Sequence, residues 1–257
     1  TGASSGLGLS IAQAFAARQA KVVLAARGSE ALADAANKLR AAGASVSYLP
    51  TDVTNAEQTV ALVRHAVETF GRLDVMVNNA GRSARGELLK TSPQQFRELF
   101  ELNLMGVVNC THAAIDELLA RQGHLVNIGS LAAKSAARYL GAYPVSKFAL
   151  AAYTQQLRLE MGPQGLHVMF VCPGPVARDE PRQRSPDELA GLPESLARPG
   201  GGVRTSAIRP EWLANAIVRG CERRRLELVV PAKAKLLFAL SQLSPRWGDY
   251  FVKRMSG

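Results

Sequence analysis

The sequence predicts a single α/β domain in which helices cover both faces of a parallel sheet, a doubly wound arrangement. Three observations support this fold class. Apolar segments of strand length alternate with amphipathic segments of helix length through most of the 257 residues. A glycine-rich opening runs directly into the first helical segment, and a Val-rich strand follows it. Residues 166–172 are almost wholly apolar, which is typical of a strand buried on both faces.

The individual elements are predicted from residue spacing and from cap and turn residues. Apolar residues recur with helical spacing in six segments, at residues 9–20, 29–42, 55–70, 92–121, 143–161 and 210–220. Short runs rich in Val, Ile and Leu predict six strands, at residues 21–26, 45–49, 73–78, 124–128, 166–172 and 226–230. A Pro-, Gly- and Arg-rich stretch at about 177–209 lacks periodicity, so we expect a loop or a partly helical lid there.

Composition and charge narrow the class of protein. The chain is 47% hydrophobic with a mean hydropathy near zero, which is typical of a soluble globular protein. Its net charge of +10 permits attraction to phosphates, nucleic acid or an anionic membrane. The late arginines lack the interleaved aromatic residues that stack bases, so we expect no nucleic-acid partner.

Cysteine usage indicates the redox setting. Cys110, Cys172 and Cys221 form no Cys-x-x-Cys pair, so we expect neither a disulfide nor a metal site. A reducing, cytoplasmic location is therefore expected. No apolar run reaches the ~20 residues that cross a bilayer. The sequence begins at Thr1 without Met, so a signal or anchor upstream would not be visible in it.

The opening glycines predict a phosphate-binding turn. Gly2 allows a tight turn with positive φ, Gly6 lets the backbone approach a phosphate, and Gly8 allows a helix to pack closely on the sheet. Free amides at the start of the following helix would then face the pyrophosphate of a dinucleotide. The alternative, when the motif is taken alone, is an ordinary Gly/Ser turn.

Arg27 indicates which dinucleotide is bound. In dinucleotide-binding folds, an acid about 20 residues beyond the glycines bonds the ribose 2′-hydroxyl, whereas an arginine there accommodates a 2′-phosphate. Ala26 takes the position of the acid and Arg27 follows it. Ser29 could add a further phosphate contact. We therefore predict NADP, with NAD less favoured; the alternative is that Arg27 is an ordinary exposed arginine.

Tyr143 and Lys147 stand four residues apart in a predicted helix. This spacing places two side chains on one helical face, so the ammonium would lie beside the phenol. A neighbouring cation favours the phenolate, and we expect it to lower the phenol pKa towards neutrality. Tyr143 would then act as a general acid or base. Such a pair, taken alone, also occurs simply as two surface neighbours on a helix.

Together the motifs resemble the short-chain dehydrogenase/reductase family over nearly the whole chain. They occur in the family's order, as Thr1-Gly2-x-x-x-Gly6-x-Gly8, Asn78-Asn79-Ala80-Gly81, Asn103, Ser130, Tyr143-x-x-x-Lys147 and Pro173-Gly174. The resemblance implies a Rossmann-type sheet of seven parallel strands that binds NAD(P). It implies a catalytic tetrad of Asn103, Ser130, Tyr143 and Lys147. The implied cofactor contacts are Gly2, Ser4, Ser5, Gly6, Leu7, Gly8, Arg27, Asp52, Val53, Asn79, Ala80, Gly81, Tyr143, Lys147, Pro173, Gly174 and Val176.

The resemblance also implies a role for each member of the tetrad. Ser130 would bond the substrate oxygen and Tyr143 would exchange a proton with it. Lys147 would hold the cofactor ribose and stabilise the phenolate, and Asn103 would steady a water that links Lys147 to solvent. These roles agree with the chemistry of the side chains.

The sequence departs from the family pattern in three places. The family's first, central strand would precede Thr1, so we expect the natural chain to start earlier. Ser5 takes a position that is often basic in NADP-preferring members, which leaves Arg27 as the main determinant. Arg178 replaces the threonine that commonly follows the Pro-Gly-x-Val motif, so the nicotinamide-side contacts of that loop are open.

We expect residues 1–231 to form the NADP-binding domain, with a substrate loop at about 177–209, and residues 232–257 to extend it as amphipathic helices. The leading hypothesis is an NADP-dependent carbonyl reductase or alcohol dehydrogenase, with hydride passing between nicotinamide and a carbonyl or secondary alcohol. An apolar substrate is expected, such as a ketone, a lipid or a steroid-like molecule. The alternative is a non-catalytic NADP-binding sensor or scaffold.

Two surfaces suggest further contacts. The predicted helices at 92–121 and 143–161 keep apolar residues on more than one face, and the family resemblance implies a homodimer or homotetramer built on them. The tail beyond Pro231 alternates apolar and basic residues with helical spacing. It can pack on its own domain, cap the substrate pocket or lie at a membrane surface.

Overall fold

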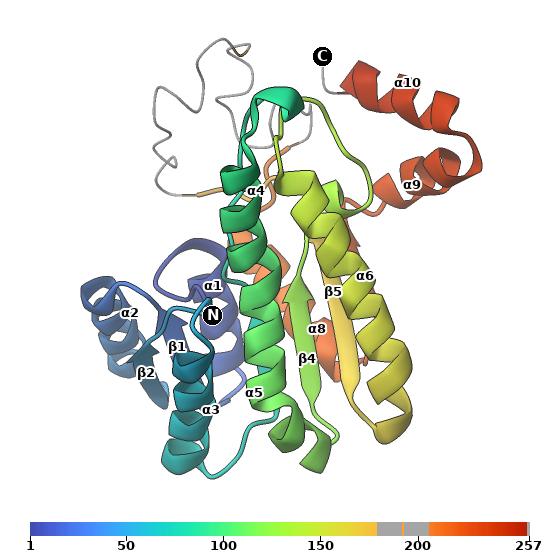
Figure 1. Cartoon of the computed structure of the whole chain (residues 1–257). Coiled ribbons are helices and arrows are strands. Elements are labelled where there is room, and N and C mark those ends of the chain that lie inside the picture. Colours follow the sequence, from blue (N-terminus) through green and yellow to red (C-terminus); the bar gives the residue numbers. More distant parts are fainter. Residues whose placement is uncertain (179–191, 193–205, 256–257) are drawn as a thin grey trace.

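The computed structural model describes residues 1–178, 192 and 206–255. In this part of the chain helices and strands alternate as the sequence predicts (Figure 1). The helices are α1 (Gly6–Ala16), α2 (Ser29–Ala41), α3 (Ala56–Phe70), α4 (Pro93–Phe100), α5 (Gly106–Ala120), α6 (Tyr143–Met161), α8 (Pro210–Glu222), α9 (Ala234–Leu243) and α10 (Pro245–Met255). The strands are β1 (Val22–Ala26), β2 (Val46–Pro50), β3 (Val75–Asn78), β4 (His124–Ile128), β5 (His167–Pro173) and β6 (Glu227–Val230).

The strands pair in parallel throughout. β1 pairs with β2, and β3, β4, β5 and β6 pair in that order as a second sheet. β3, β4 and β5 begin level with one another, with Val75 opposite His124 and His124 opposite His167. β6 begins further along β5, with Glu227 opposite Phe170, and the two strands end together at Pro173 and Val230. The carboxyl ends of the strands therefore meet at one edge of the sheet, where parallel α/β folds place their ligands.

Residues Thr1 to Ala3 lie between the two sheets. The Thr1 amine donates to the Val77 carbonyl at 2.9 Å, and the Ala3 amide donates to the Ala25 carbonyl at 3.1 Å. Beside them, β1 and β3 line a mainly apolar cavity of about 310 Å³, and none of the expected catalytic residues lines it. The existence of a strand ahead of Thr1 stays a prediction.

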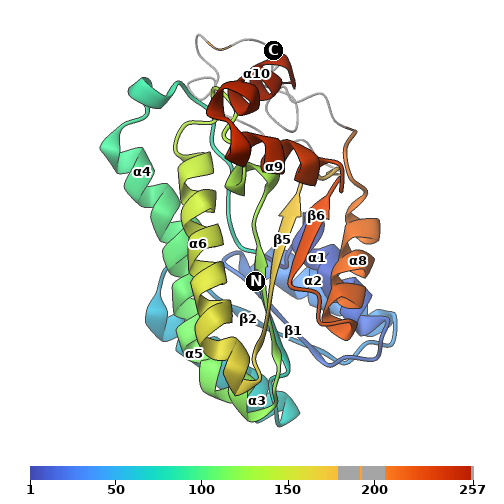
Figure 2. The same ribbon diagram turned by 90° about the vertical axis from the view of Figure 1, so that its right-hand side faces the viewer.

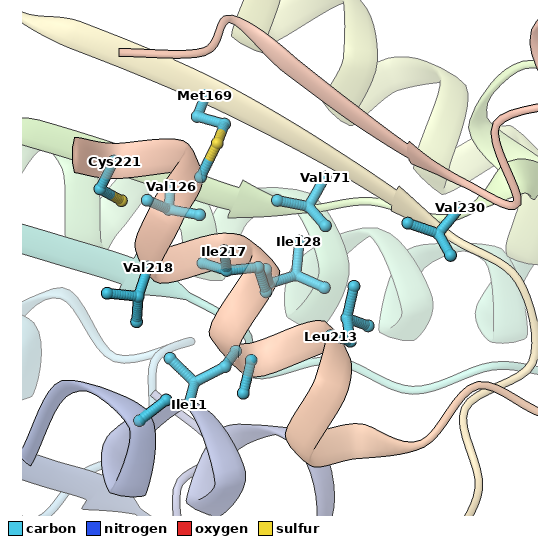
Figure 3. Close-up of a cluster of buried hydrophobic side chains, with 12 residues drawn as sticks. Ile11, Val126, Ile128, Met169, Val171, Leu213, Ile217, Val218, Cys221 and Val230 are labelled. Atoms are coloured by element: carbon cyan, nitrogen blue, oxygen red, sulfur yellow. The ribbon is translucent and has the colours of Figure 1, made fainter. Parts of the chain in front are cut away.

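One apolar cluster fixes α1 and α8 to one face of the sheet (Figure 3). Val126 and Val171 on neighbouring strands pack against Leu213 and Ile217 of α8, and Ile11 joins them from α1. Most of these side chains are fully buried. Each such residue adds roughly 1.5–3 kcal/mol of burial free energy. The glycine-rich turn that begins α1 is therefore held firmly at the edge of the sheet.

The opposite face is covered by α3, α5 and α6 (Figures 1 and 2). Leu118 of α5 and Leu62 of α3 pack on Leu125 of β4, and Leu150 of α6 packs on Phe170 of β5. Helices on both faces of a parallel sheet confirm the doubly wound α/β fold.

Two predicted helices differ from the structure by more than two residues. α1 starts at Gly6 rather than residue 9, and it ends before Gln19, whose positive φ of 59° is incompatible with a continuing helix. The long helix predicted at 92–121 is divided by a π-helical turn, Glu101–Met105, between α4 and α5. This turn carries Asn103, and such turns often lie at functional sites.

Candidate active site

Tyr143 and Ser130 meet at the carboxyl end of β4. Ser130 is two residues beyond β4 and precedes a short 3₁₀ turn, Leu131–Ala133, where its hydroxyl accepts from the Ala132 amide at 3.1 Å. Tyr143 is the first residue of α6, and its phenol shares a hydrogen bond with Ser130. The two hydroxyl groups that the sequence assigns to one substrate oxygen are thus adjacent.

The phenol of Tyr143 is not acidified in this structure. Burial raises its pKa above the ordinary value of 10.0, while the hydrogen bond with Ser130 and the guanidinium groups of Arg85 and Arg178 act in the opposite direction. The prediction that its neighbours lower this pKa towards neutrality is therefore wrong for the protein alone. Desolvation of the phenolate outweighs the nearby cations.

Lys147 is buried one turn further along α6. Its ammonium donates to the Ile128 carbonyl at 2.8 Å, at the end of β4. Burial lowers its pKa from 10.5 to about 8, because desolvation penalises the cation. A lysine in this position changes charge near physiological pH, which suits a residue that takes part in proton transfer.

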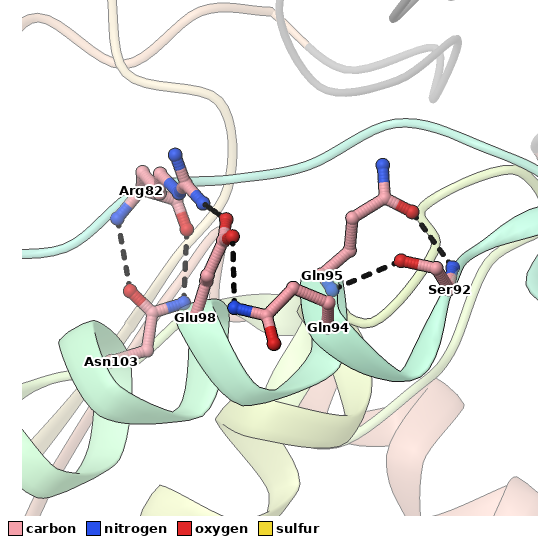
Figure 4. Close-up of polar contacts among 6 residues, drawn as sticks. All are labelled: Arg82, Ser92, Gln94, Gln95, Glu98 and Asn103. Atoms are coloured by element: carbon pink, nitrogen blue, oxygen red, sulfur yellow. Dashed lines mark hydrogen bonds and ion pairs between the residues drawn. The ribbon is translucent and has the colours of Figure 1, made fainter.

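Asn103 joins the π turn to the loop that follows β3 (Figure 4). Its amide oxygen accepts from the Arg82 amide at 2.9 Å, and its amide nitrogen donates to the Arg82 carbonyl at 2.9 Å. The same nitrogen donates to the Ser146 hydroxyl at 3.1 Å. Because both amide hydrogens are used in these bonds, the backbone of Asn103 is the better candidate for holding a water.

Gly81 lies between Asn103 and Lys147. A β-carbon at Gly81 would lie 2.9 Å from the Asn103 amide oxygen and 3.7 Å from the Lys147 nitrogen. The absence of a side chain at this position lets the loop after β3, the π turn and α6 approach one another closely. The structure thus brings all four residues of the expected tetrad to one region, at the carboxyl edge of the sheet.

The glycine-rich turn forms an open cradle at the start of α1. Gly2 has a positive φ of 61°, and a β-carbon at Gly8 would lie 2.2 Å from the Gly2 carbonyl, so only glycine fits there. Gly6 also has a positive φ, of 53°, and open space lies where its side chain would be. No acid occupies the first turn of α1, and Ser5 makes no side-chain cap bond. These features fit the diphosphate of a dinucleotide.

Thr1 ties this turn to the Asn-Asn-Ala-Gly segment. Its hydroxyl accepts from the backbone amides of Asn79 and Ala80, both at 3.0 Å. The Asn79 side chain donates in return to the Thr1 carbonyl at 2.9 Å and to the Gly2 carbonyl at 3.3 Å. The two predicted cofactor segments therefore form one continuous surface.

Arg27, Asp52 and Val53, which the family resemblance implies as cofactor contacts, lie just beyond the carboxyl ends of β1 and β2. Arg27 is exposed directly after β1, and its charge helps to lower the pKa of Asp52, although the larger cause is the hydrogen bond from the Thr54 amide. The Val53 carbonyl accepts from Asn109 at 3.0 Å, which fixes this loop to α5.

Pro173, Gly174 and Val176 continue β5 past the same edge. The Gly174 amide donates to the Val230 carbonyl at 2.7 Å, and Val176 forms a bridge with Ile208. Arg178 is the last described residue before residue 192, and most of the predicted substrate loop at about 177–209 lies outside the described residues. Ser4, Ser5 and Leu7 complete the cradle at α1, with Leu7 packed against the main core.

Sequence reasoning did not foresee the contacts of three residues that hold the site together. Thr1 was named only as part of the glycine motif, and Arg82 and Ser146 were not singled out. Ser146 is fully buried, donates to the Tyr143 carbonyl at 2.8 Å and accepts from Asn103. Its position beside Lys147 in the motif was visible, but its partners are distant in sequence.

Comparison with known proteins agrees with this geometry. A family model described as short chain dehydrogenase matches residues 1–189. The ketoacyl reductase HetN of Nostoc sp. strain PCC 7120 is 34% identical over 252 residues, covering 95% of this chain and 84% of that protein. The glycine betaine reductase ATRR of Emericella nidulans is 36% identical over 222 residues, covering 85% of this chain and 17% of that protein.

Solved structures are similar over most of their length. A short-chain dehydrogenase/reductase from Burkholderia phymatum in complex with NAD has a TM-score of 0.82 and 27% identity, covering 95% of this chain and 92% of that one. An alcohol dehydrogenase from the archaeon Thermococcus sibiricus, complexed with 5-hydroxy-NADP, has a TM-score of 0.72 and 27% identity, covering 89% of this chain and 91% of that one.

The fold and site define a dinucleotide-binding oxidoreductase. The chain belongs to the short-chain dehydrogenase/reductase family and is an NAD(P)-dependent dehydrogenase or reductase. In the described residues, no helix is long and apolar enough to cross a membrane.

Proposed function

We propose that the protein is an NADP-dependent carbonyl reductase, or an alcohol dehydrogenase in the reverse direction, in which Tyr143 exchanges the proton with the substrate oxygen. The observation that carries this proposal is the contact between the Tyr143 phenol and the Ser130 hydroxyl, with Lys147 buried one turn away. The name of the Nostoc relative, a ketoacyl reductase, supports carbonyl reduction.

The nicotinamide, when bound, supplies or accepts the hydride. Ser130 donates a hydrogen bond to the substrate oxygen and so polarises the carbonyl. Tyr143 gives its proton to the same oxygen as negative charge develops there, and its raised pKa keeps it protonated and ready to donate. We propose that the Lys147 cation, one turn along α6 from Tyr143, stabilises the phenolate that remains and returns a proton to it, since the pKa of Lys147 is about 8.

Asn103 is proposed to support proton transfer between Lys147 and solvent. Its side chain fixes the Arg82 backbone and Ser146, so its own backbone carbonyl is held in place within the π turn. We propose that this carbonyl positions a water between Lys147 and solvent. The remaining predicted contacts, from the glycine cradle to Val176, would bind the cofactor along the carboxyl edge.

NADP is the proposed cofactor for two reasons. Arg27 is exposed directly after β1, and Ala26 stands at the position where an acid would bond the ribose 2′-hydroxyl of NAD. The solved relatives carry either cofactor type, so this preference rests on Arg27 itself. Replacing Arg27 by Ala should weaken NADPH binding by about 1.5–3 kcal/mol, because a charge-assisted hydrogen bond to phosphate is lost. NADH affinity, measured on the same variant, should change far less. Equal weakening of both would contradict the assignment.

The substrate is proposed to be an apolar carbonyl compound or secondary alcohol.

The active enzyme is proposed to be a homodimer or homotetramer that assembles through α5 and α6. Exposed apolar side chains on and beside these helices support the oligomer, namely Met105, Val145, Phe148 and Leu159.

The function is tested by mixing the protein with NADPH and a panel of ketones, ketoacyl esters and lipid-like carbonyls of increasing size. We expect loss of NADPH absorbance with at least the apolar members. Tight NADPH binding without oxidation across the panel would instead favour a non-catalytic sensor or scaffold.

A further inference from the structure

The two helices after the last strand carry large exposed apolar side chains. We call α9 and α10, which are joined at Ser244, the C-terminal hairpin. A typical soluble protein scatters such residues singly, whereas here they gather on one short segment. The exposed fractions are 83% for Leu243, 68% for Leu236, 62% for Trp247 and 58% for Tyr250.

The inner side of α10 is already used for packing against α9. Gly248 is buried, and a β-carbon there would lie 2.7 Å from the Ser241 hydroxyl of α9. Phe251 and Val252 are half-buried on the same side. α9 in turn packs on the domain through Ala234 and Phe238, which join the cluster around Phe170 and Val229. The packing of α10 on α9 therefore leaves the opposite, outer side of α10 exposed.

The outer side of α10 combines aromatic and basic residues. Trp247, Tyr250 and Arg254 are spaced three and four residues apart, so they share one helical face, and all three are exposed. Arg246 and Lys253 flank that face and are exposed as well. Trp and Tyr are the side chains that favour the boundary between lipid and water, where a basic residue can reach the headgroups.

The charge of this segment complements an anionic surface. Residues 232–257 contain five cations, Lys233, Lys235, Arg246, Lys253 and Arg254, and a single acid, Asp249. We propose that the C-terminal hairpin docks the protein on an anionic lipid surface, with Trp247 and Tyr250 entering the headgroup region. A short amphipathic helix of this kind lies in the interface and does not span the bilayer.

The C-terminal hairpin lies on the same side of the molecule as the candidate active site. Figures 1 and 2 both show α9 and α10 beyond the carboxyl ends of the strands, the edge at which the tetrad lies. Docking through α10 would bring this edge towards the bilayer, from which an apolar substrate can enter. The docking itself does not depend on the proposed reaction and can be tested without it.

The test measures sedimentation of the purified protein with vesicles of phosphatidylcholine containing about 30% phosphatidylserine, and with phosphatidylcholine alone. Binding should require the anionic lipid and weaken with salt. The variant Arg246→Gln/Lys253→Gln/Arg254→Gln should bind about 100-fold more weakly, since each cation near an anionic surface is worth about fivefold. A matched control is Lys38→Gln/Arg64→Gln/Arg121→Gln, which removes three exposed cations elsewhere and should bind like the parent protein.

A second variant tests the aromatic residues. Trp247→Ser/Tyr250→Ser should lower vesicle binding at least tenfold while leaving the thermal midpoint unchanged, because both side chains are exposed. In a Trp212→Phe background, Trp247 fluorescence should shift to shorter wavelength when vesicles are added.

Four results would overturn the proposal. One is equal vesicle binding by the triple variant and its control, and another is equal binding to vesicles without anionic lipid. The third is a Trp247→Ser/Tyr250→Ser protein that binds vesicles normally but has a smaller mass by light scattering, which would show that a second copy covers the hairpin. The same variant with normal vesicle binding and a raised KM only for bulky carbonyls would show a substrate cap instead.

Discussion

Replacing Lys147 by Met should remove a pH dependence of stability that the buried ammonium creates. In the folded protein the pKa of Lys147 is lowered from 10.5 to about 8 by burial. Below about pH 8 both the folded and the unfolded states hold the proton, so the folded state carries the full desolvation penalty. Between about pH 8 and 10.5 only the unfolded state holds it, so the stability of the native state rises with pH.

The magnitude follows from the same two pKa values. Each unit of difference corresponds to about 1.4 kcal/mol, and integration from about pH 7 to 9.5 gives a rise of about 2 kcal/mol from this group. The Met variant loses the 2.8 Å bond to the Ile128 carbonyl, but that cost does not depend on pH. The stability of the parent protein minus that of the Met variant should therefore rise steadily by about 2 kcal/mol from about pH 7 to 9.5.

The assay is urea unfolding of cofactor-free protein at intervals of half a pH unit. Lys38→Met serves as the control, since Lys38 is exposed and should leave the pH profile unchanged. Profiles of the parent and the Lys147→Met protein that run parallel from about pH 7 to 9.5 would refute the buried, desolvated lysine on which the proton-transfer argument depends.

Three further predictions concern other parts of the molecule. Gly8→Ala should lower stability by about 1–3 kcal/mol and weaken NADPH binding, measured by unfolding and titration, because its β-carbon would meet the Gly2 carbonyl at 2.2 Å. Burial lowers the pKa of His124 to about 4, so between about pH 6.5 and 4 the unfolded state takes up the proton first and the folded protein loses stability as pH falls. His124→Gln should reduce this loss, measured by urea unfolding at each pH. An unchanged fall in stability between about pH 6.5 and 4 would contradict this. Phe148→Glu should reduce the mass seen by light scattering at micromolar concentration, whereas a parent protein that is already monomeric would count against the oligomer.

The order of the elements could be predicted from the sequence because each depends on local periodicity and local turn chemistry. Every predicted strand has a counterpart within two residues of its predicted bounds, and β4 matches fully. Asn55 caps α3 through the Gln58 amide, and Ser92 with Gln95 forms a capping box at α4. In each of these bonds the two partners stand three residues apart, so the sequence alone indicates the pairing.

The site could be predicted only where the motif residues themselves meet. Tyr143 and Lys147 are fixed by helical spacing, but the bonds of Asn103 to Arg82 and Ser146 join segments 21 and 43 residues away. The π turn that carries Asn103 could not be distinguished from the sequence, because its five residues continue the helical pattern of apolar residues on either side. The wrong direction for the Tyr143 pKa has the same origin, since sequence spacing shows neighbours but not the depth of burial.

Replacement of Tyr143 by Phe is the most direct test of the proposed catalytic role. Phe keeps the packed ring and removes only the hydroxyl that bonds Ser130. With NADPH and a carbonyl that the parent protein reduces, turnover should fall by about 10²-fold or more, because the positioned proton donor is lost. NADPH affinity, measured separately by fluorescence titration, should stay within about twofold. Near-normal turnover of the Phe variant would contradict the assignment of Tyr143 as the proton donor.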